Sequence, residues 1–264
     1  MSIGRKTLKA ATATAAVAAA ATLGAASPAH AASTAGTMTP IGQSPAHATV
    51  TTQSNHFSPH IIGGTVAYNP AYVQLIFGQD GGTYGCTGEA IGSQWVLTAR
   101  HCVDGISWMD VYYSNSTTNR GTAHPADQVG YSPNGDVALV HLASPKALNS
   151  YAHMTSSYTP RQETGTIYGY GLRANQTPTD HLYKANVEIN AISTDAYGGE
   201  ALHVNGIDGA SNHGDSGGPL VVGGEIVGVC STGDSADPGS NTQAGSNYAS
   251  LTDSRSWVQQ VTGI

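Results

Sequence analysis

Short hydrophobic stretches recur along the chain from residue 61 to its end, and small or polar residues separate them. The stretches are rich in β-branched and aromatic side chains, while glycine, proline, asparagine or aspartate lies between them. This pattern is typical of the strands of a β-sandwich or a β-barrel. The clearest examples are residues 72–77, 95–97, 137–140, 166–168 and 225–229. Only the tail, residues 253–261, has the polar start and the apolar spacing of three to four that predict a helix.

The N-terminal region follows a different pattern. Three basic residues within positions 5–9 precede an alanine-rich apolar run over residues 10–26, and Pro-Ala-His-Ala follows at 28–31. A charged start, an apolar middle and a small-residue exit are the parts of a secretory signal peptide. The run is too short and too weakly apolar to anchor the chain in a membrane. We therefore expect residues 1–31 to be removed on secretion into the extracellular space.

Residues 32–60 consist mainly of serine, threonine, alanine, proline, glutamine and histidine, with hardly a large apolar side chain. Such a composition cannot bury a core, so it predicts a flexible segment. The segment is either a surface linker or a propeptide that is removed on activation. The remaining residues, 61–264, are numerous enough to form one or two β-rich units.

Charge and composition exclude several functional classes. The chain is 39% hydrophobic, which is enough to fill a core, although it is only 10% charged and contains 33 glycines. From residue 61 onward it carries all 17 acidic residues but only seven of the ten basic ones, a formal charge of −10 with neutral histidines. An acidic domain without a basic patch is not expected to bind nucleic acid or a membrane surface.

The cysteine count limits the covalent cross-links. Cys86, Cys102 and Cys230 are the three cysteines, and an odd number in an exported protein allows at most one disulfide within the chain. Cys86 and Cys102 flank a strand-like stretch, so a hairpin could bring them together. The chain contains neither Cys-x-x-Cys nor His-Glu-x-x-His, and its histidines are scattered. We therefore expect no metal and no other cofactor.

Three short segments carry candidate chemistry. Residues 214–219 read Gly-Asp-Ser-Gly-Gly-Pro. Glycines on both sides of Ser216 let the backbone approach a substrate and turn its N–H groups inward, as a nucleophile with an oxyanion site requires. His101 directly follows a strand-like run and adjoins Cys102, which would fix its position. Asp136 opens an apolar strand, where it is either an ordinary turn residue or a buried carboxylate that orients an imidazole.

Together these segments resemble the chymotrypsin/trypsin family of serine peptidases, because His101, Asp136 and Ser216 occur in that family's order. Ile-Ile-Gly-Gly at residues 61–64 resembles the family's mature N-terminus, and Cys86 and Cys102 match its disulfide around the histidine. The similarity extends over essentially all of residues 61–264. The chain is identified as a secreted, bacterial-type member of the family.

The resemblance implies an all-β fold of two six-stranded antiparallel barrels, followed by a C-terminal helix. The active site would lie between the barrels, with His101 and Asp136 in the first and Ser216 in the second. Ser216 would attack the carbonyl carbon of a polypeptide substrate while His101 takes its proton and Asp136 orients the imidazole. The peptidase would act as a monomer and without a cofactor.

The resemblance also implies an oxyanion site and a means of activation. The backbone N–H groups of Gly214 and Ser216 would stabilise the oxyanion. Cleavage before Ile61 would free an α-amino group, which would insert and pair with Asp215. Residues 32–60 would then be a propeptide.

The loop at the predicted base of the substrate pocket departs from the family's pattern. The base falls on Ala210, with Ser211 beside it, so a preference for lysine or arginine is not expected. His213 could add a preference for an acidic side chain. Asn212 replaces a cysteine that is common in the family, and the loss of that disulfide could shift the loop by two residues. Asp208 would then reach the base and select lysine or arginine.

The wall of the pocket departs from the family as well. Where the family has Ser-Trp-Gly, the alignment gives Gly228, Val229 and Cys230. Cys230 would therefore be the unpaired cysteine and would lie near the substrate backbone.

Two other functional classes compete with the peptidase. A family member that has lost catalysis would be a secreted binding protein, but such proteins usually lack a triad residue, and none is missing here. An esterase of the α/β-hydrolase type also has Gly-x-Ser-x-Gly, but its aspartate and histidine follow the serine. The last histidine of this chain is His213, so the order of residues excludes the esterase.

Overall fold

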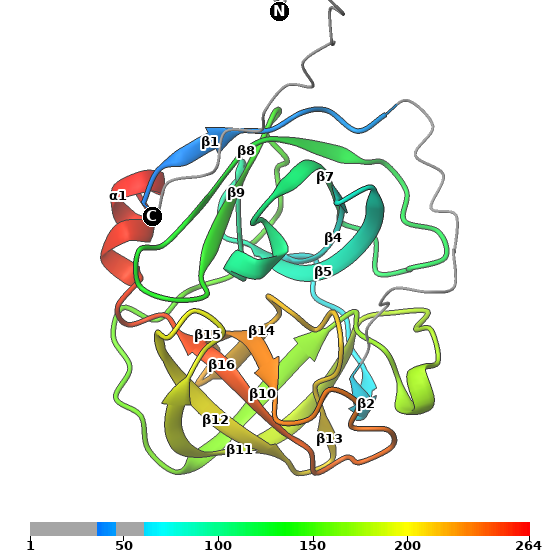
Figure 1. The fold of residues 1–264 in the computed structure, drawn as a ribbon, viewed down its shortest axis with the longest axis vertical. Coiled ribbons are helices and arrows are strands. Elements are labelled where there is room, and N and C mark those ends of the chain that lie inside the picture. The colour runs from blue at the N-terminus through cyan, green and yellow to red at the C-terminus, as the bar shows by residue number, and fades with distance from the viewer. Residues whose placement is uncertain (1–35, 46–60) are drawn as a thin grey trace, which may run out of the picture.

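The computed structural model describes residues 36–45 and 61–264, and these residues form two β-barrels that lie one above the other in Figure 1. Neighbouring strands of the first barrel follow the order β8-β7-β4-β5-β6-β9, and pairing between β8 and β9 closes it. All of these pairings are antiparallel. The six strands are β4 (Tyr72–Gln79), β5 (Gly82–Ala90), β6 (Trp95–Thr98), β7 (Ile106–Tyr112), β8 (His124–Tyr131) and β9 (Ala138–Leu142).

The second barrel has the order β10-β14-β15-β16-β12-β11, and pairing between β10 and β11 closes it. Its pairings are again antiparallel. The six strands are β10 (Glu163–Gly169), β11 (Tyr183–Thr194), β12 (Glu200–Gly206), β14 (Pro219–Val222), β15 (Glu225–Gly233) and β16 (Gly245–Ser250). Two closed six-stranded antiparallel barrels are the fold that the resemblance implied, so that prediction is confirmed.

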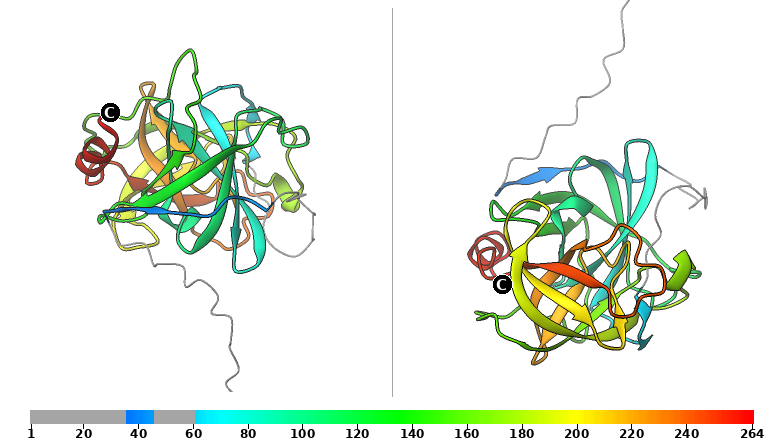
Figure 2. Two further views of the ribbon diagram at one scale, coloured as in Figure 1. Left: turned by 90° about the horizontal axis from the view of Figure 1, so that it is seen from above. Right: turned by 60° about the horizontal axis from the view of Figure 1, so that its bottom comes forward.

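Short elements complete the fold. The helix predicted over residues 253–261 is confirmed as α1 (Arg255–Thr262), which lies against the side of the two barrels in both views of Figure 2. The remaining elements are β1 (Met38–Pro40), β2 (Ile62–Gly63), β3 (Thr65–Val66), β13 (Gly209–Ala210) and the two 3-10 helices η1 (Arg100–Cys102) and η2 (Ala174–Gln176).

A buried apolar cluster joins the two barrels. Leu97 and Leu139 from the first barrel pack with Val229 and Ala249 from the second, and Trp257 of α1 covers them. Each of these four strand residues is fully buried. Because removal of apolar surface from water favours this packing, the cluster fixes the position of one barrel against the other. A site built from both barrels is therefore held rigidly.

Part of the predicted leader belongs to the first barrel. Strand β1 pairs antiparallel with β8, with Met38 opposite Gly130, and the Ile41 N–H donates to the Asp127 carbonyl. A Cβ at Gly130 would lie 2.5 Å from the Thr37 carbonyl oxygen, so the close approach of β1 requires glycine there. The prediction that residues 32–60 are flexible throughout is therefore wrong for residues 36–45. The strand is held mainly by backbone hydrogen bonds, which composition does not reveal.

The other predictions for the N-terminal region concern residues that the structure does not describe. The signal peptide, residues 1–31, lies outside the described residues, as does most of the predicted propeptide. Within the described part of the chain, none of the helices has the length and hydrophobicity needed to cross a membrane.

Candidate active site

Asp136 is buried just before β9, and its carboxylate receives three hydrogen bonds. The backbone N–H of His101 donates to its Oδ1 over 2.9 Å, and His101 Nδ1 lies 2.8 Å from Oδ2. The hydroxyl of Ser231, from the second barrel, donates to the same Oδ2 over 2.6 Å. Because a carboxylate only accepts hydrogen bonds, it selects the tautomer of His101 that carries its proton on Nδ1. The Nε2 of His101 is then an acceptor.

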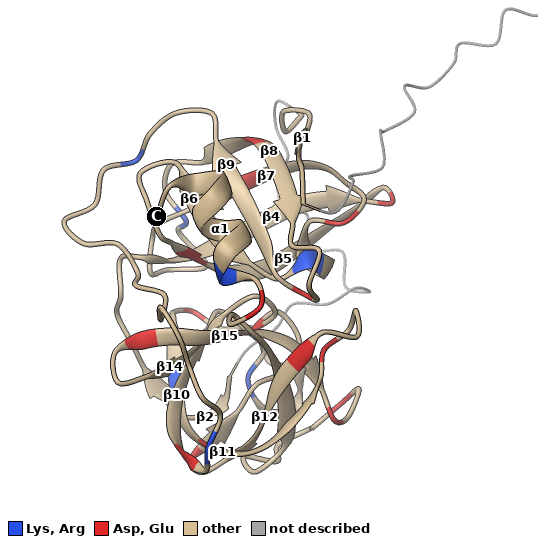
Figure 3. Ribbon diagram, turned by 90° about the vertical axis from the view of Figure 1, so that its left-hand side faces the viewer, with Lys and Arg blue, Asp and Glu red and all other residues tan. Residues whose placement is uncertain are grey.

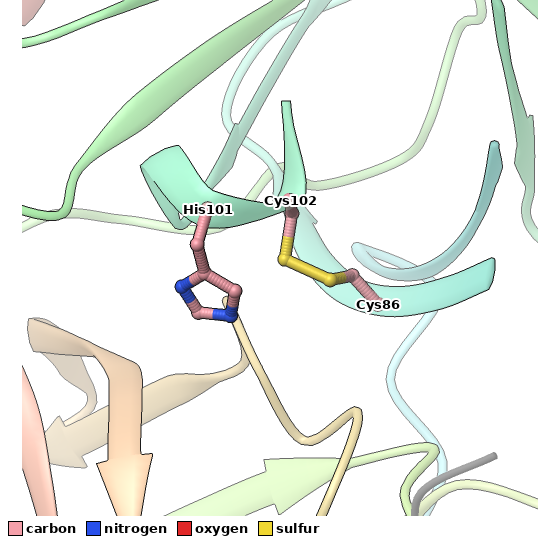
Figure 4. Close-up of side chains that lie close together, drawn as sticks. All are labelled: Cys86, His101 and Cys102. Atoms are coloured by element: carbon pink, nitrogen blue, oxygen red, sulfur yellow. A yellow bond between two sulfur atoms is a disulfide. The ribbon is translucent and has the colours of Figure 1, made fainter. Parts of the chain in front are cut away.

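A disulfide fixes the chain next to His101. Cys86 of β5 is bonded to Cys102 of η1, as predicted, and Cys230 is a buried free cysteine. Figure 4 shows the two sulfur atoms beside the imidazole. Potential ligand atoms of the three residues lie within 4.8 Å of one another, but both sulfurs are consumed by the disulfide and are unavailable as thiolate ligands. The cluster therefore serves to position His101.

Ser216 lies in a turn of the second barrel that is hydrogen-bonded to β5 of the first barrel. The N–H of Thr87 in β5 donates to the Ser216 carbonyl over 2.9 Å, and the Thr87 hydroxyl donates to the Gly214 carbonyl. Gly217 has φ +76°, and a Cβ there would lie 2.0 Å from the Thr98 hydroxyl oxygen. Glycine is therefore required directly after Ser216, since no other residue combines this dihedral angle with this contact.

The N–H groups of Gly214 and Ser216 are available to a ligand. Within residues 36–45 and 61–264, neither N–H group has a hydrogen-bond acceptor. The neighbouring N–H groups are bonded: that of Gly217 donates to the Cys230 carbonyl, and that of Gly218 donates to the Asp215 carbonyl. The turn therefore satisfies its other donors and leaves two that could stabilise a developing negative charge.

Asp215 is a fully buried carboxylate. Its oxygens accept hydrogen bonds from the backbone N–H groups of Gly171 and Asn212, each over 2.9 Å. Burial nevertheless raises the pKa of Asp215 well above its ordinary value. Among the described residues no basic side chain forms a salt bridge with it. The predicted partner, Ile61, is also fully buried, in the core of the second barrel.

A pocket of about 440 Å³ is lined by His101 of the first barrel and by residues of the second. His101 and Ser216 both line it, as do three of the predicted pocket residues, Ser211, His213 and Cys230. The other residues of the lining are Asn212, Ser231, Thr232, Gly233, Ser235, Ala236, Pro238 and Gly245. None of the lining residues is acidic or basic apart from the two histidines. In Figure 3 the acidic residues are distributed over both barrels instead.

Comparisons with known proteins identify the family of the chain. Residues 61–258 match the sequence model of the trypsin family. The chain belongs to the trypsin family. It is a serine endopeptidase by that membership.

Curated relatives of this trypsin-family chain come from insects and a frog. Trypsin beta of Drosophila erecta is 28% identical over 226 residues, covering 75% of this chain and 87% of the relative. Serine protease 1 of Drosophila melanogaster is 30% identical over 77% of this chain and 86% of the relative. Trypsin of Xenopus laevis is 30% identical over 66% and 80%. These relatives give no support to the expectation of a bacterial-type member.

A solved structure shares the fold. It is described as HL collagenase and superposes with a TM-score of 0.66 at 24% identity, covering 77% of this chain and 99% of that protein. At this level of identity the likeness concerns the two-barrel architecture alone.

The predicted wall of the pocket is correct for Cys230 and wrong for Gly228 and Val229. Gly228 and Val229 are buried within the sheet, where they pair with β14 and β16, and neither lines the pocket. The wall is formed by Ser231, Thr232 and Gly233, and Ser231 also contacts Asp136. The signal was present in the sequence, because Ser231-Thr232-Gly233 matches the family's Ser-Trp-Gly at two of three positions.

The predicted base of the pocket is only partly correct. Ala210 does not line the pocket: it is 1% exposed and pairs with Ile62 between β13 and β2. The competing residue, Asp208, is exposed, and its carboxylate accepts hydrogen bonds from the N–H and the side-chain amide of Asn186, each over 2.7 Å. The two-residue shift that would bring Asp208 to the base is therefore not observed.

Cys230 is a neutral member of the pocket lining. Burial, together with the negative charge of Asp215, raises the pKa of the Cys230 thiol to about 12. A thiol with this pKa carries almost no thiolate at neutral pH, so it does not compete with Ser216 as a nucleophile.

Proposed function

We propose that the chain is a secreted endopeptidase that cleaves polypeptides through Ser216, His101 and Asp136. The observation that carries the proposal is that Ser216 and His101 line the same pocket, while the imidazole is hydrogen-bonded to the buried Asp136. Secretion through residues 1–31 and action as a monomer complete the proposal. No cofactor takes part in it.

The chemistry follows from the atoms around the pocket. The Ser216 hydroxyl attacks the carbonyl carbon of the scissile bond while His101 Nε2 accepts its proton, which gives a tetrahedral intermediate. The oxyanion accepts hydrogen bonds from the N–H groups of Gly214 and Ser216. His101 then donates the proton to the leaving amine, and water releases the acyl group by the same steps in reverse order. Asp136 stabilises the imidazolium that forms in each half of the reaction.

We further propose that the protein is a zymogen activated by cleavage before Ile61. The buried Asp215, without a basic partner among the described residues, supports a role for the new α-amino group. This cleavage breaks none of the hydrogen bonds between β1 and β8, because they involve residues 36–41 of the leader. Residues 32–60 would thus be a propeptide whose described part is also a strand of the first barrel.

The test of this function is titration with a phosphonofluoridate, which forms a covalent bond to an activated serine. We expect one reactive site per activated protein molecule and parallel loss of peptide hydrolysis. Mass spectrometry should find the adduct on Ser216. The alternative, a secreted binding protein of the same family, predicts no adduct and no hydrolysis at any protein concentration. An adduct on another serine would contradict the assignment of the nucleophile.

The second prediction concerns the residue before the scissile bond. The pocket lining carries no carboxylate, and a cationic side chain would be desolvated there without a partner. We therefore expect leucyl and alanyl peptides to be cleaved at least about tenfold more efficiently than arginyl peptides, measured as kcat/KM on matched chromogenic substrates. Glutamyl peptides test the contribution of His213.

Asp208→Asn is the matched control for this prediction. Asp208 is bonded to Asn186 away from the pocket, so the variant should keep the same order of substrates. Arginyl turnover above all others in the wild type, removed by Asp208→Asn, would contradict the prediction and establish the shifted loop.

A further inference from the structure

The turn between β11 and β12 crosses from the second barrel to the catalytic aspartate of the first. Its residue Asp195 is 8% exposed, and its Oδ2 accepts a hydrogen bond from the backbone N–H of Asp136 over 2.8 Å. Its Oδ1 accepts from the N–H groups of Tyr197 and Gly199, over 2.8 and 2.9 Å. In Figure 1, β11 and β12 belong to the lower barrel and β9, which Asp136 precedes, to the upper one. Asp195 therefore ties a main-chain atom of Asp136 to the opposite barrel.

The same turn reaches the carboxylate of Asp136 by a second path. The N–H of Ala196 donates to the Ser231 hydroxyl oxygen over 3.0 Å, and the Ser231 hydroxyl donates to Asp136 Oδ2 over 2.6 Å. The hydroxyl thus has an assigned donor and an assigned acceptor, which fixes the direction of its proton. Both the backbone and the side chain of Asp136 are therefore held by two adjacent residues of one turn.

Two glycines make room for the Asp195 carboxylate. A Cβ at Gly135, where φ is +100°, would lie 2.2 Å from Asp195 Oδ2, and a Cβ at Gly199 would lie 2.6 Å from the same atom. Both distances are far shorter than a van der Waals contact. The turn can therefore approach Asp136 only because glycine occupies both position 135, next to Asp136, and position 199, in the turn.

The turn also contacts the helix that carries His101. The guanidinium of Arg100 lies 3.9 Å from the ring centroid of Tyr131 and 3.9 Å from that of Tyr197, so it is stacked between the first barrel and the turn. The Tyr197 hydroxyl donates to Asp104 Oδ2 over 3.3 Å. Arg100 directly precedes His101 in η1. The turn is thus in contact with the segments of both the histidine and the aspartate.

We propose that residues 195–199 form a positioning turn in which Asp195 holds Asp136, and through it His101, in the reactive arrangement. Neither Asp195 nor Tyr197 lines the substrate pocket, so the turn acts on the catalytic residues and not on the substrate. Loss of the Asp195 carboxylate leaves the buried N–H of Asp136 without its acceptor. The peptide of Asp136 then shifts, and with it the hydrogen bond that orients the imidazole. The inference rests on the proposed function, because it assigns the turn a role in the same triad.

The test compares Asp195→Ala and Asp195→Asn with the wild type, with kcat expressed per site titrated by the phosphonofluoridate. We expect Asp195→Ala to lower kcat by about 10- to 100-fold, since small displacements of catalytic groups have effects of this size, with KM changed by less than about threefold. Asp195→Asn keeps one acceptor oxygen and the shape of the side chain, so a smaller loss of kcat is expected. If Asp195→Ala fails to fold, the kcat of Asp195→Asn tests the inference instead.

Glu200→Gln is the matched control. Glu200 is exposed, directly follows the turn and carries the same charge, but its side chain forms no hydrogen bond or salt bridge with the residues that the structure describes. It should retain the kcat of the wild type. An unchanged kcat per titrated site in a folded Asp195 variant, or a rise in KM alone, would overturn the inference while leaving the peptidase function intact. A wild-type protein that neither hydrolyses peptides nor reacts with the titrant would instead refute the proposed function itself.

Discussion

Ser216→Ala is expected to lower kcat for peptide hydrolysis by about four to six orders of magnitude, because no other nucleophile lines the pocket in a reactive form. Cys230 is the one thiol in the lining, and its raised pKa keeps it protonated. His101→Ala should have an effect of similar size, since it removes the base. The measurement is kcat under saturating substrate, together with a thermal melt to establish that each variant is folded.

Because the three residues act as a unit, their effects should not add. The double variant of Ser216 and His101 should be little slower than either single variant. Asp136→Asn should cost about 10⁴-fold in kcat. The Asp136 carboxylate accepts from two groups of His101 and from the Ser231 hydroxyl, whereas an asparagine has one acceptor oxygen and would present N–H donors to groups that are themselves donors.

His141 and Asp127 provide the matched control for the triad pair. His141 Nδ1 lies 2.7 Å from Asp127 Oδ1, so the pair has the same contact between Nδ1 and a carboxylate as His101 and Asp136, but neither residue lines the pocket. His141→Ala should keep the kcat of the wild type. Hydrolysis by Ser216→Ala at the wild-type rate would refute the nucleophile, and additive losses in the double variant would refute a concerted triad.

The sequence predicted those features of the fold and the site that depend on residues close together in the chain. The short β-branched stretches are strands, the C-terminal apolar spacing is a helix, and Cys86 is bonded to Cys102. The two residues after Ser216, Gly217 and Gly218, must be glycine because a Cβ at either would collide with its neighbours, so this part of the motif has a reason in backbone geometry. His101 and Asp136 each lie beside a strand with a strong apolar pattern, but it is the resemblance to the family that assigned them to the triad.

The errors concern contacts between residues distant in the sequence. In β15 the residues before Ser231 are mostly small and apolar, and the local sign of the pocket wall is the partial match of Ser231-Thr232-Gly233 to the family's Ser-Trp-Gly. The deciding contact, from Ser231 to Asp136, spans 95 residues. Asp195 likewise lies in a segment whose composition is that of an ordinary turn. Its hydrogen bond with Asp136 joins residues that are 59 positions apart. Strand β1 pairs through backbone groups that every residue possesses, so the polar composition of its segment gave no indication of it.

Activation should require an α-amino group at Ile61. Secreted, active protein should give the N-terminal sequence Ile-Ile-Gly-Gly, and the uncut chain should have a kcat/KM at least about 100-fold lower, the order of effect expected when an oxyanion site is incomplete. The physical reason is the buried Asp215, whose oxygens receive two backbone hydrogen bonds but no positive charge from the described side chains. A terminal ammonium would supply that charge and fix the turn that contains Gly214 and Ser216.

The pH dependence of the cut enzyme tests the same ion pair. Pairing with Asp215 raises the pKa of the amine above its unfolded value of about 8, so the pair contributes fully to stability below that pH. The contribution is lost as the pH rises through the folded pKa of the amine. Activity and thermal stability should therefore fall together in that alkaline range. In the uncut chain the raised pKa of the buried Asp215 also makes stability fall as the pH rises, but from the ordinary carboxyl range upward.

Two variants separate the ion pair from other effects of cleavage. Protein cut one residue earlier, so that it begins at His60, displaces the amine and should remain as inactive as the uncut chain. Asp215→Asn, cut correctly, should also remain inactive, whereas Asp208→Asn should be fully active, because that exposed carboxylate is bonded to Asn186 instead. Full activity in protein that retains His60 would refute activation through Ile61. We expect inactivity because Asp215 and Ile61 are both completely buried, so an ammonium group at Ile61 would give the Asp215 carboxylate the opposite charge that the described side chains do not supply.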